Sequence, residues 1–133
     1  VQLEVGTNAS DFEHRSFGEE LSLCQRYYHQ LVDGTNQAIG QGSYYNSGIW
    51  QVHVDFPTTM RTAPDLIITA AADHYNITAG NANDSINGDD NIQVASTRAC
   101  FLQFTTNVSG TQGNGGHVHS ARSTSSVAFD AEL

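Results

Sequence analysis

Residues 49–56 read Ile49-Trp50-Gln51-Val52-His53-Val54-Asp55-Phe56, with an apolar side chain at every second position. Successive side chains of a β-strand point to opposite faces, so this alternation predicts a strand with one buried face and one polar face. The residues expected on the buried face are Trp50, Val52, Val54 and Phe56. Those expected on the polar face are Gln51, His53 and Asp55. A chain that contains such a strand is expected to be rich in β-structure.

Shorter apolar or alternating runs on both sides of this segment predict further strands. They are Ala38–Tyr45, Asp65–Ala71, His74–Thr78, Ile92–Thr97, Cys100–Asn107 and Ser126–Leu133. Pro57 and Pro64 bracket residues 58–63, which are expected to be an edge strand or a connection, because proline cannot donate a hydrogen bond to a ladder. Many short strands with turns between them are typical of a β-sandwich or jelly-roll-like domain, and the chain is therefore predicted to be mainly β.

One short helix is predicted near the N-terminus, over about residues 17–31. Ser16 and Glu19 have the spacing of a capping box, and acidic residues are favourable in the first turn of a helix. The apolar residues that share one face of this helix are Phe17, Leu21, Cys24, Tyr28 and Leu31. Such a helix needs another surface to cover its apolar face.

The segment before this helix has a different character. Val1–Val5 alternates apolar and polar residues like a strand, and turn-forming residues follow it. Residues 1–12 are therefore predicted to be the tail of a preceding domain or a linker. Residues 13–133 have a length that suits one domain and are predicted to form a single β-rich C-terminal domain.

The charge of the chain restricts its partners. It contains no lysine, and five arginines face fourteen acidic residues, for a formal net charge of −9. Nucleic-acid binding requires clustered basic side chains and is therefore not expected. Adhesion to an anionic membrane is disfavoured for the same reason, and no apolar run is long enough to insert into a bilayer. A neutral glycan or a protein partner stays open.

Composition also bears on assembly and on cysteine chemistry. Only 38% of the residues are hydrophobic, so the core of one copy is expected to be modest and oligomerisation would enlarge it. Cys24 and Cys100 are far apart and match no metal or redox spacing. A disulfide between them is possible, but two buried free thiols are favoured.

Two polar segments are predicted to be long loops, residues 81–91 and 109–126. The first offers hard oxygen ligands of the kind that Ca²⁺ prefers, although the spacing of an EF-hand fails and a solvated turn is the alternative. Its candidate ligands are Asp84, Asn87, Asp89 and Asp90. The second loop contains His117-Val118-His119, whose imidazoles would share one face of an extended segment and could chelate a transition metal.

No motif predicts catalysis. The chain has no nucleophile elbow, no zinc-protease motif and no phosphate-binding glycine loop, so it is not expected to be an enzyme and no catalytic residue is assigned. Aromatic side chains could instead stack on sugar rings. The candidates for contact with a receptor or glycan are Tyr44, Tyr45 and Tyr75, of which the adjacent Tyr44 and Tyr45 must point to opposite faces of a strand.

The N-terminal part of this chain resembles a known family. The run Phe12-Glu-His-Arg-Ser-Phe-Gly-Glu-Glu-Leu21, followed by Cys24-Gln-Arg-Tyr-Tyr28, is similar to the start of the C-terminal domain of tail-fibre and other virion proteins of tailed bacteriophages. The closing Phe129-Asp-Ala-Glu-Leu133 resembles the end of such chains. The resemblance covers the first 28 residues and the last few, and it is thin over residues 33–126.

The resemblance implies a homotrimeric module on the exterior of a virion that recognises a bacterial surface glycan or outer-membrane protein. In trimeric fibre tips, pairs such as His117-Val-His119 can surround a metal on the three-fold axis. No catalytic set is carried over. The alternatives are a trimerisation or capping module that binds nothing, a depolymerase of capsular glycan, and a monomeric lectin-like module.

Overall fold

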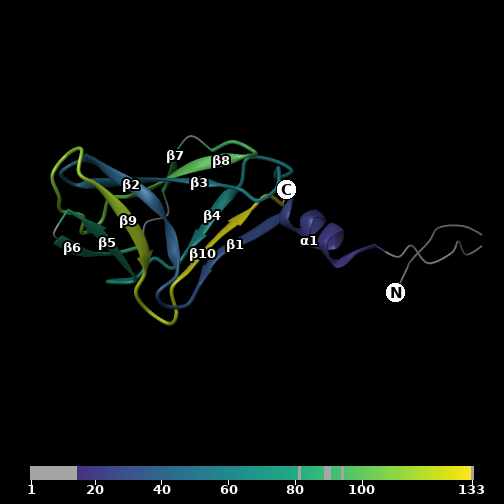
Figure 1. Ribbon diagram of the computed structural model, residues 1–133, viewed down its shortest axis with the longest axis horizontal. Coiled ribbons are helices and arrows are strands. Elements are labelled where there is room, and N and C mark those ends of the chain that lie inside the picture. The colour runs from purple at the N-terminus through teal and green to yellow at the C-terminus, as the bar shows by residue number, and fades with distance from the viewer. Residues whose placement is uncertain (1–14, 81, 89–90, 94, 133) are drawn as a thin grey trace, which may run out of the picture.

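The computed structural model describes residues 15–80, 82–88, 91–93 and 95–132. Within them the chain forms two antiparallel β-sheets and one short helix, and the helix stands at one end of the molecule beyond the sheets (Figure 1). The expectation of a mainly β chain is therefore confirmed. The strand predicted over Val1–Val5 lies outside the described residues.

The larger sheet has seven strands in the order β6-β5-β9-β2-β3-β8-β7. In that order they are Ala82–Ile86, Tyr75–Ala79, Gly115–Ser120, Ala38–Asn46, Ile49–Asp55, Ala99–Phe104 and Ile92–Gln93. Strands β2 and β3 form a hairpin, whereas β9 is inserted between β5 and β2, so distant segments of the chain lie side by side. Residues 58–63 form a connection and not an edge strand.

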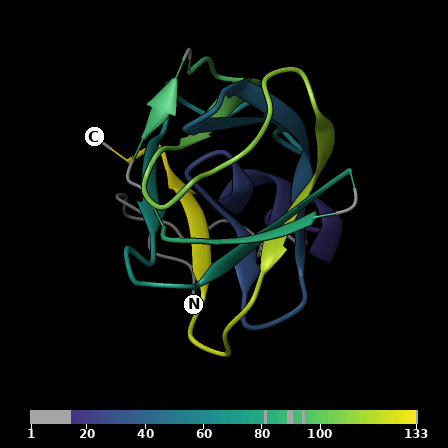
Figure 2. The same cartoon turned by 90° about the vertical axis from the view of Figure 1, so that its left-hand side faces the viewer.

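The smaller sheet has three strands in the order β1-β10-β4. They are Tyr28–Asp33, Ser126–Asp130 and Asp65–Ile68. The C-terminal strand β10 is central and pairs antiparallel with both neighbours. Seen from the end opposite the helix, the strands of the two sheets surround the interior (Figure 2).

A single cluster of buried side chains joins the two sheets. The alternation over residues 49–56 is confirmed: the predicted inward residues are all buried, and Trp50 and Val52 are 0% exposed. The ring of Trp50 meets Tyr44 edge to face, with ring centroids 4.9 Å apart. From the smaller sheet, Val127 and Phe129 pack into the same cluster. Both sheets therefore contribute to one apolar interior, which is where the hydrophobic effect acts.

The helix differs from its prediction in length and in packing. The capping box of Ser16 and Glu19 is present, but α1 spans only Phe17–Gln25. Residues 28–33 form strand β1 instead, because pairing with β10 keeps their backbone hydrogen-bonded and also buries Val32 in the core. No residue of α1 is buried, so nothing in the described part of the chain covers the apolar face as expected.

The cysteines are both free, as favoured from their spacing, but only one is buried. Cys100 lies in the core on β8, whereas Cys24 is exposed on α1. The expectation that both thiols are buried is therefore wrong for Cys24. No residue of α1 is buried, so the described part of the chain does not cover this thiol.

The two segments expected to be loops each contain a strand. Residues 82–86 form β6, and residues 115–120 form β9. Gly116 is one reason that β9 was not predicted. A Cβ at this position would lie 2.0 Å from the carbonyl oxygen of Thr78 on β5, so the strand requires a glycine here. A residue without a side chain gives no alternating signal, yet here it permits close backbone approach between neighbouring strands.

Candidate functional site

The two histidines of the H-x-H motif lie side by side on the outer face of the larger sheet. His117 pairs in register with Thr78 of β5, and His119 pairs with Asn76. Their rings are 5.7 Å apart between centroids, and His117 is exposed whereas His119 is partly buried. The expected sharing of one face is therefore present, on a strand and not in a loop.

Burial governs the chemistry of this pair. It lowers the pKa of His119, and the neighbouring His117 lowers that pKa further. Nδ1 of His119 is buried and has no hydrogen-bond partner among the residues that the structure describes, which leaves a nitrogen lone pair or N–H unused. Within the described ranges no third His, Cys, Asp or Glu joins the pair to form a metal-binding group. One copy thus offers two nitrogen ligands, whereas a structural zinc site uses four.

The three tyrosines singled out for receptor contact have different environments. Tyr44 is 5% exposed and Tyr75 is 0% exposed, so neither can stack on an external sugar. Burial raises the pKa of both hydroxyls, and Tyr75 donates a hydrogen bond of 2.8 Å to the carbonyl of Ser126. Tyr45 is 60% exposed, as the alternation along β2 requires. Of the three, Tyr45 alone is accessible.

Two of the four predicted calcium ligands, Asp84 and Asn87, make hydrogen bonds within the protein. The Asp84 carboxylate accepts a hydrogen bond of 2.6 Å from the backbone N–H of Ser109, and a hydrogen bond joins it to Tyr44. The Asn87 side chain accepts one from the backbone N–H of Asp73 at 3.3 Å. Asp89 and Asp90 lie outside the described residues. The described members of this set therefore make hydrogen bonds within the protein that stabilise turns.

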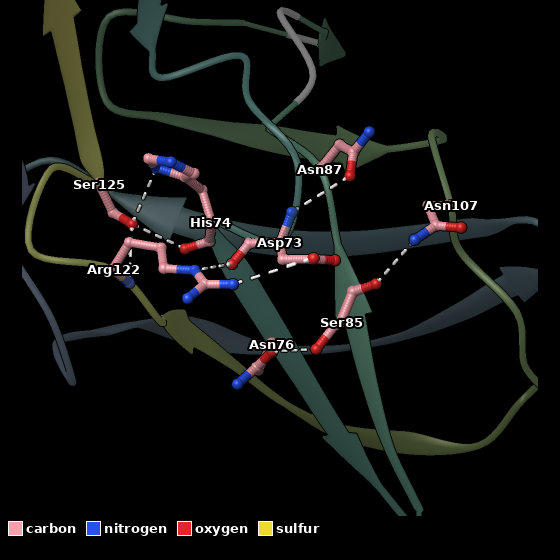
Figure 3. Close-up of polar contacts among 8 residues, drawn as sticks. All are labelled: Asp73, His74, Asn76, Ser85, Asn87, Asn107, Arg122 and Ser125. Atoms are coloured by element: carbon pink, nitrogen blue, oxygen red, sulfur yellow. Dashed lines mark hydrogen bonds and ion pairs between the residues drawn. The ribbon is translucent and has the colours of Figure 1, made fainter.

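A polar depression of about 280 Å³ opens beside β5 and β6, and we call it the Arg122 depression. Its lining residues are Asp73, Asn76, Ser85, Ala121 and Arg122. They come from four segments: the turn before β5, strand β5, strand β6 and the turn after β9. Figure 3 shows the side chains of the four polar residues, Asp73, Asn76, Ser85 and Arg122.

Hydrogen bonds hold the lining side chains in place (Figure 3). Nε of Arg122 donates to the carbonyl oxygen of Asp73 at 3.2 Å, and its Nη2 is 3.9 Å from the Asp73 carboxylate. The Ser85 hydroxyl donates to Oδ1 of Asn76 at 2.9 Å. That bond uses the carbonyl oxygen of the Asn76 amide and leaves its NH₂ group available.

Two further hydrogen bonds hold the segments that border the depression. The Asn107 side chain donates to the carbonyl oxygen of Ser85 at 3.1 Å, and the turn at Asp73 is tied to Asn87. Asp73 and Asn107 both have positive φ angles, of 57° and 63°, which Asp and Asn adopt more readily than most residues. The site is therefore built from turns whose conformation the local residues favour.

His74 and Ser125 lie close together next to the depression without forming a catalytic pair. The Ser125 hydroxyl oxygen is 3.3 Å from Nδ1 of His74, but it donates to the His74 carbonyl oxygen at 2.7 Å. Ser125 is 0% exposed, so this hydroxyl cannot reach a substrate. Its contacts, including one of 3.2 Å from the backbone N–H of Arg122, stabilise the turn that carries Arg122.

Sequence reasoning did not find the Arg122 depression. Its polar residues are separated by up to 49 positions, the interval between Asp73 and Arg122, and none belongs to a recognisable motif. The pairing of β5 with β6 and β9 brings these residues together, and no local sequence pattern reveals that pairing. Comparisons of the chain with protein-family models, curated proteins and solved structures find no match.

Proposed function

We propose that this chain is an exterior module of a tailed-phage fibre that recognises a neutral saccharide on the host surface through the Arg122 depression. In this proposal the two sheets form a β-sandwich of the jelly-roll kind, and three copies assemble around an axis. The observation that carries the proposal is the depression itself, a concave site lined by a guanidinium, a carboxylate, an amide and a hydroxyl. The resemblance of the N-terminal residues to phage virion proteins supports the setting.

The chemistry of the lining suits sugar hydroxyls. Asp73 can accept hydrogen bonds from hydroxyls, while Arg122 and the NH₂ group of Asn76 can donate to them. The volume lies just below the roughly 300–1,000 Å³ of sites for drug-sized ligands, so a single sugar ring is a suitable occupant. Asp73 lies against Arg122 and offsets its charge, and the chain carries a net charge of −9. Both features favour neutral over acidic saccharides.

A glycan array probed with the chain and with two matched variants tests the proposal. Asn76→Ala removes a lining amide, and binding to the preferred saccharide is expected to fall by about tenfold, the effect of losing roughly one hydrogen bond together with the group it orients. Asn83→Ala is the control, because Asn83 accepts a 2.8 Å hydrogen bond from Thr78 on the same two strands but does not line the depression.

Asn83→Ala is expected to bind as the unmodified chain does. Equal loss in both variants, or no saccharide binding by the unmodified chain, would contradict the proposal. Binding to an outer-membrane protein from the host in place of any glycan would likewise contradict it.

A purely structural role is the second candidate, and exposed α1 is the observation that favours it. A trimerisation or capping module would present this helix to its neighbours and would bind no receptor. Host adsorption separates the two functions: substitution of Arg122 abolishes adsorption if the depression recognises the host, and leaves adsorption intact if the module is structural. Release of new reducing ends from host polysaccharide would instead identify a depolymerase.

A further inference from the structure

A strip of outward residues runs across the larger sheet from the Arg122 depression to strand β8. The order and register of β5, β9, β2, β3 and β8 set these residues side by side on the outer face. We call them the outer strip: Asn76, His119, His117, Gln41, His53 and Phe101. Strands of a sheet lie about 4.7–4.9 Å apart, so the spacings between β5 and β8 add up to roughly 19 Å. The outer strip is therefore longer than one sugar ring.

The outer strip carries neither a carboxylate nor a guanidinium. Its side chains are amides, imidazoles and one aromatic ring, in a chain that has fourteen acidic residues and five arginines. The next outward residue on β3 is Asp55, whose carboxylate lies 3.6 Å from Nδ1 of His53 at the border of the strip. The smaller sheet, by contrast, exposes Asp65. Amides and neutral imidazoles both donate and accept hydrogen bonds, so this surface is complementary to a neutral partner that is rich in hydroxyls.

One end of the outer strip belongs to the Arg122 depression. Asn76 lines the depression and is also the register partner of His119, so the two surfaces are continuous. The Asn76 oxygen accepts the hydrogen bond from Ser85, which fixes the amide and leaves its NH₂ group to donate (Figure 3). From there the strip continues to His117, whose side chain is exposed. A saccharide that occupies the depression can therefore extend onto β9 without crossing a charged group.

The other end of the outer strip presents an aromatic ring beside hydrogen-bonding groups. Phe101 is 40% exposed, and its ring meets that of His53 edge to face, with centroids 5.2 Å apart. A depression of about 200 Å³ borders both residues. The next outward residue on β8, Gln103, accepts a 3.0 Å hydrogen bond from the Asn91 amide, which leaves the NH₂ group of Gln103 available. One exposed aromatic alone is common on a protein surface, but a ring with amide donors beside it matches the apolar face and the hydroxyls of a sugar.

We infer that the outer strip extends the Arg122 depression into a binding surface for a linear, neutral polysaccharide. One sugar occupies the depression, and the following sugars run across β9, β2 and β3 to the ring of Phe101. The inference rests on the proposed function and deepens it, because it makes the recognised group a stretch of several sugars in place of a single one.

Titration calorimetry of the full chain with neutral hexose oligosaccharides tests the inference. The probes are gluco-, manno- and galacto-oligosaccharides of one to six residues. From the monosaccharide to the hexasaccharide the affinity is expected to rise about a hundredfold, the effect of two or three further hydrogen bonds. The greater number of equivalent sugars in a hexasaccharide can account for a sixfold rise at most, so a larger gain reports contacts beyond the depression.

Variants at the far end and in the middle of the outer strip locate these contacts. Phe101→Ala is expected to weaken hexasaccharide binding about tenfold and to leave monosaccharide binding unchanged, because the ring lies several strands away from the depression. Gln41→Ala, at an exposed side chain, should act in the same direction without removing an aromatic ring. Ile67→Ala is the matched control, since Ile67 is 47% exposed but lies on β4 of the smaller sheet, and it should bind every oligosaccharide as the unmodified chain does.

The outcomes separate this inference from the proposed function. Affinity that rises no more than sixfold with length, or hexasaccharide binding that is equal in Phe101→Ala, Gln41→Ala and the unmodified chain, overturns the outer strip. Monosaccharide binding that Asn76→Ala weakens would still support the Arg122 depression. Equal losses in Ile67→Ala and Phe101→Ala also overturn the strip, because the long saccharide then binds elsewhere. If no saccharide of any length binds, the inference and the proposed function fail together.

Discussion

Gly110 lies directly against the ring of Tyr44. A Cβ at position 110 would lie 2.2 Å from Cζ of Tyr44 and 2.3 Å from Cε1, well inside van der Waals contact. Tyr44 in turn meets Trp50 edge to face in the core. A glycine in a polar connection therefore determines where a core aromatic ring can sit.

Gly110→Ala is expected to destabilise the fold by about 1–3 kcal/mol, because the tyrosine ring and the connection must move apart to admit a methyl group. Urea denaturation followed by tryptophan fluorescence measures this change. Gly48→Ala is the matched control, since its Cβ would have as its nearest contact only Oδ1 of Asn46 at 3.9 Å. Equal unfolding midpoints for the two variants would show that position 110 is not tightly packed.

The two cysteines are expected to react with thiol reagents at very different rates. Burial raises the pKa of the Cys100 thiol to about 12, so almost none of it is thiolate at neutral pH, whereas Cys24 is exposed. The native chain should therefore be modified quickly at Cys24, and at Cys100 only after unfolding. Mass spectrometry of iodoacetamide-treated protein, before and after denaturation, checks the order; rapid native labelling of Cys100 would contradict it.

Stability is expected to fall as the pH drops from 7.5 to 5.5. Burial lowers the pKa of His29, whose ring stacks on Phe129 at 6.3 Å between centroids and meets Phe56 edge to face. Its folded pKa is thus below the unfolded value of about 6.5, so the unfolded chain takes up a proton first and unfolding becomes easier. Well above this unfolded pKa, the contribution of His29 to the free energy of unfolding does not change with pH.

Urea titrations at several pH values test this dependence. His29→Gln should be less stable at pH 7.5 but should lose less stability on acidification, because the titrating ring is absent. His119→Gln should also make stability depend less steeply on pH, since burial and His117 both lower the pKa of His119 in the folded chain. If the free energy of unfolding changes with pH equally in His29→Gln and in the unmodified chain, the folded pKa of His29 is not lowered.

Tyr75→Phe is expected to cost about 0.5–1.5 kcal/mol of stability and to leave saccharide binding unchanged. The substitution removes the hydrogen bond to the Ser126 carbonyl, which still accepts one from the backbone N–H of Thr69 at 3.0 Å, so the cost stays that of one hydrogen bond. Thermal unfolding and the glycan array measure the two effects. Loss of binding in a folded Tyr75→Phe variant would mean that the ring is reached by ligand after all.

Zn²⁺ is expected to raise the melting temperature at pH 7.5 through His117 and His119, and chelator should reverse the rise. A single copy supplies two nitrogens, so the shift should be larger in an assembly that brings further donors together. It should weaken as the pH falls, because a metal-bound imidazole must be neutral and protons compete with the metal for its nitrogen. His117→Ala should show no shift; equal shifts in that variant would place the metal elsewhere.

Local patterns succeeded where a residue's own neighbours determine its structure. The capping box at Ser16 and Glu19 needs four consecutive residues, and the alternation from Trp50 to Phe56 reflects one strand with one buried face. The seven segments predicted as strands within the described residues each contain one. The mainly β class followed from them.

The failures occur where long-range contacts compete with local preference. Residues 28–31 continue a helical apolar pattern, but pairing of β1 with β10, about a hundred positions away, makes them a strand. Tyr75 has the character of an exposed aromatic in sequence, and its position on the inner face of β5 buries it. No pattern within either segment contains the partner that decides the outcome.

The sequence by itself therefore determined the β-rich class, the start of the helix and the partition of the Trp50 strand between core and surface, because these depend on residues a few positions apart. Only the tertiary structure decided which way the apolar face of α1 points and that Asp73, Asn76, Ser85 and Arg122 line one depression. The physical reason is that sheet registers join segments far apart in the chain, and their free energy depends on packing that exists only after the strands have met.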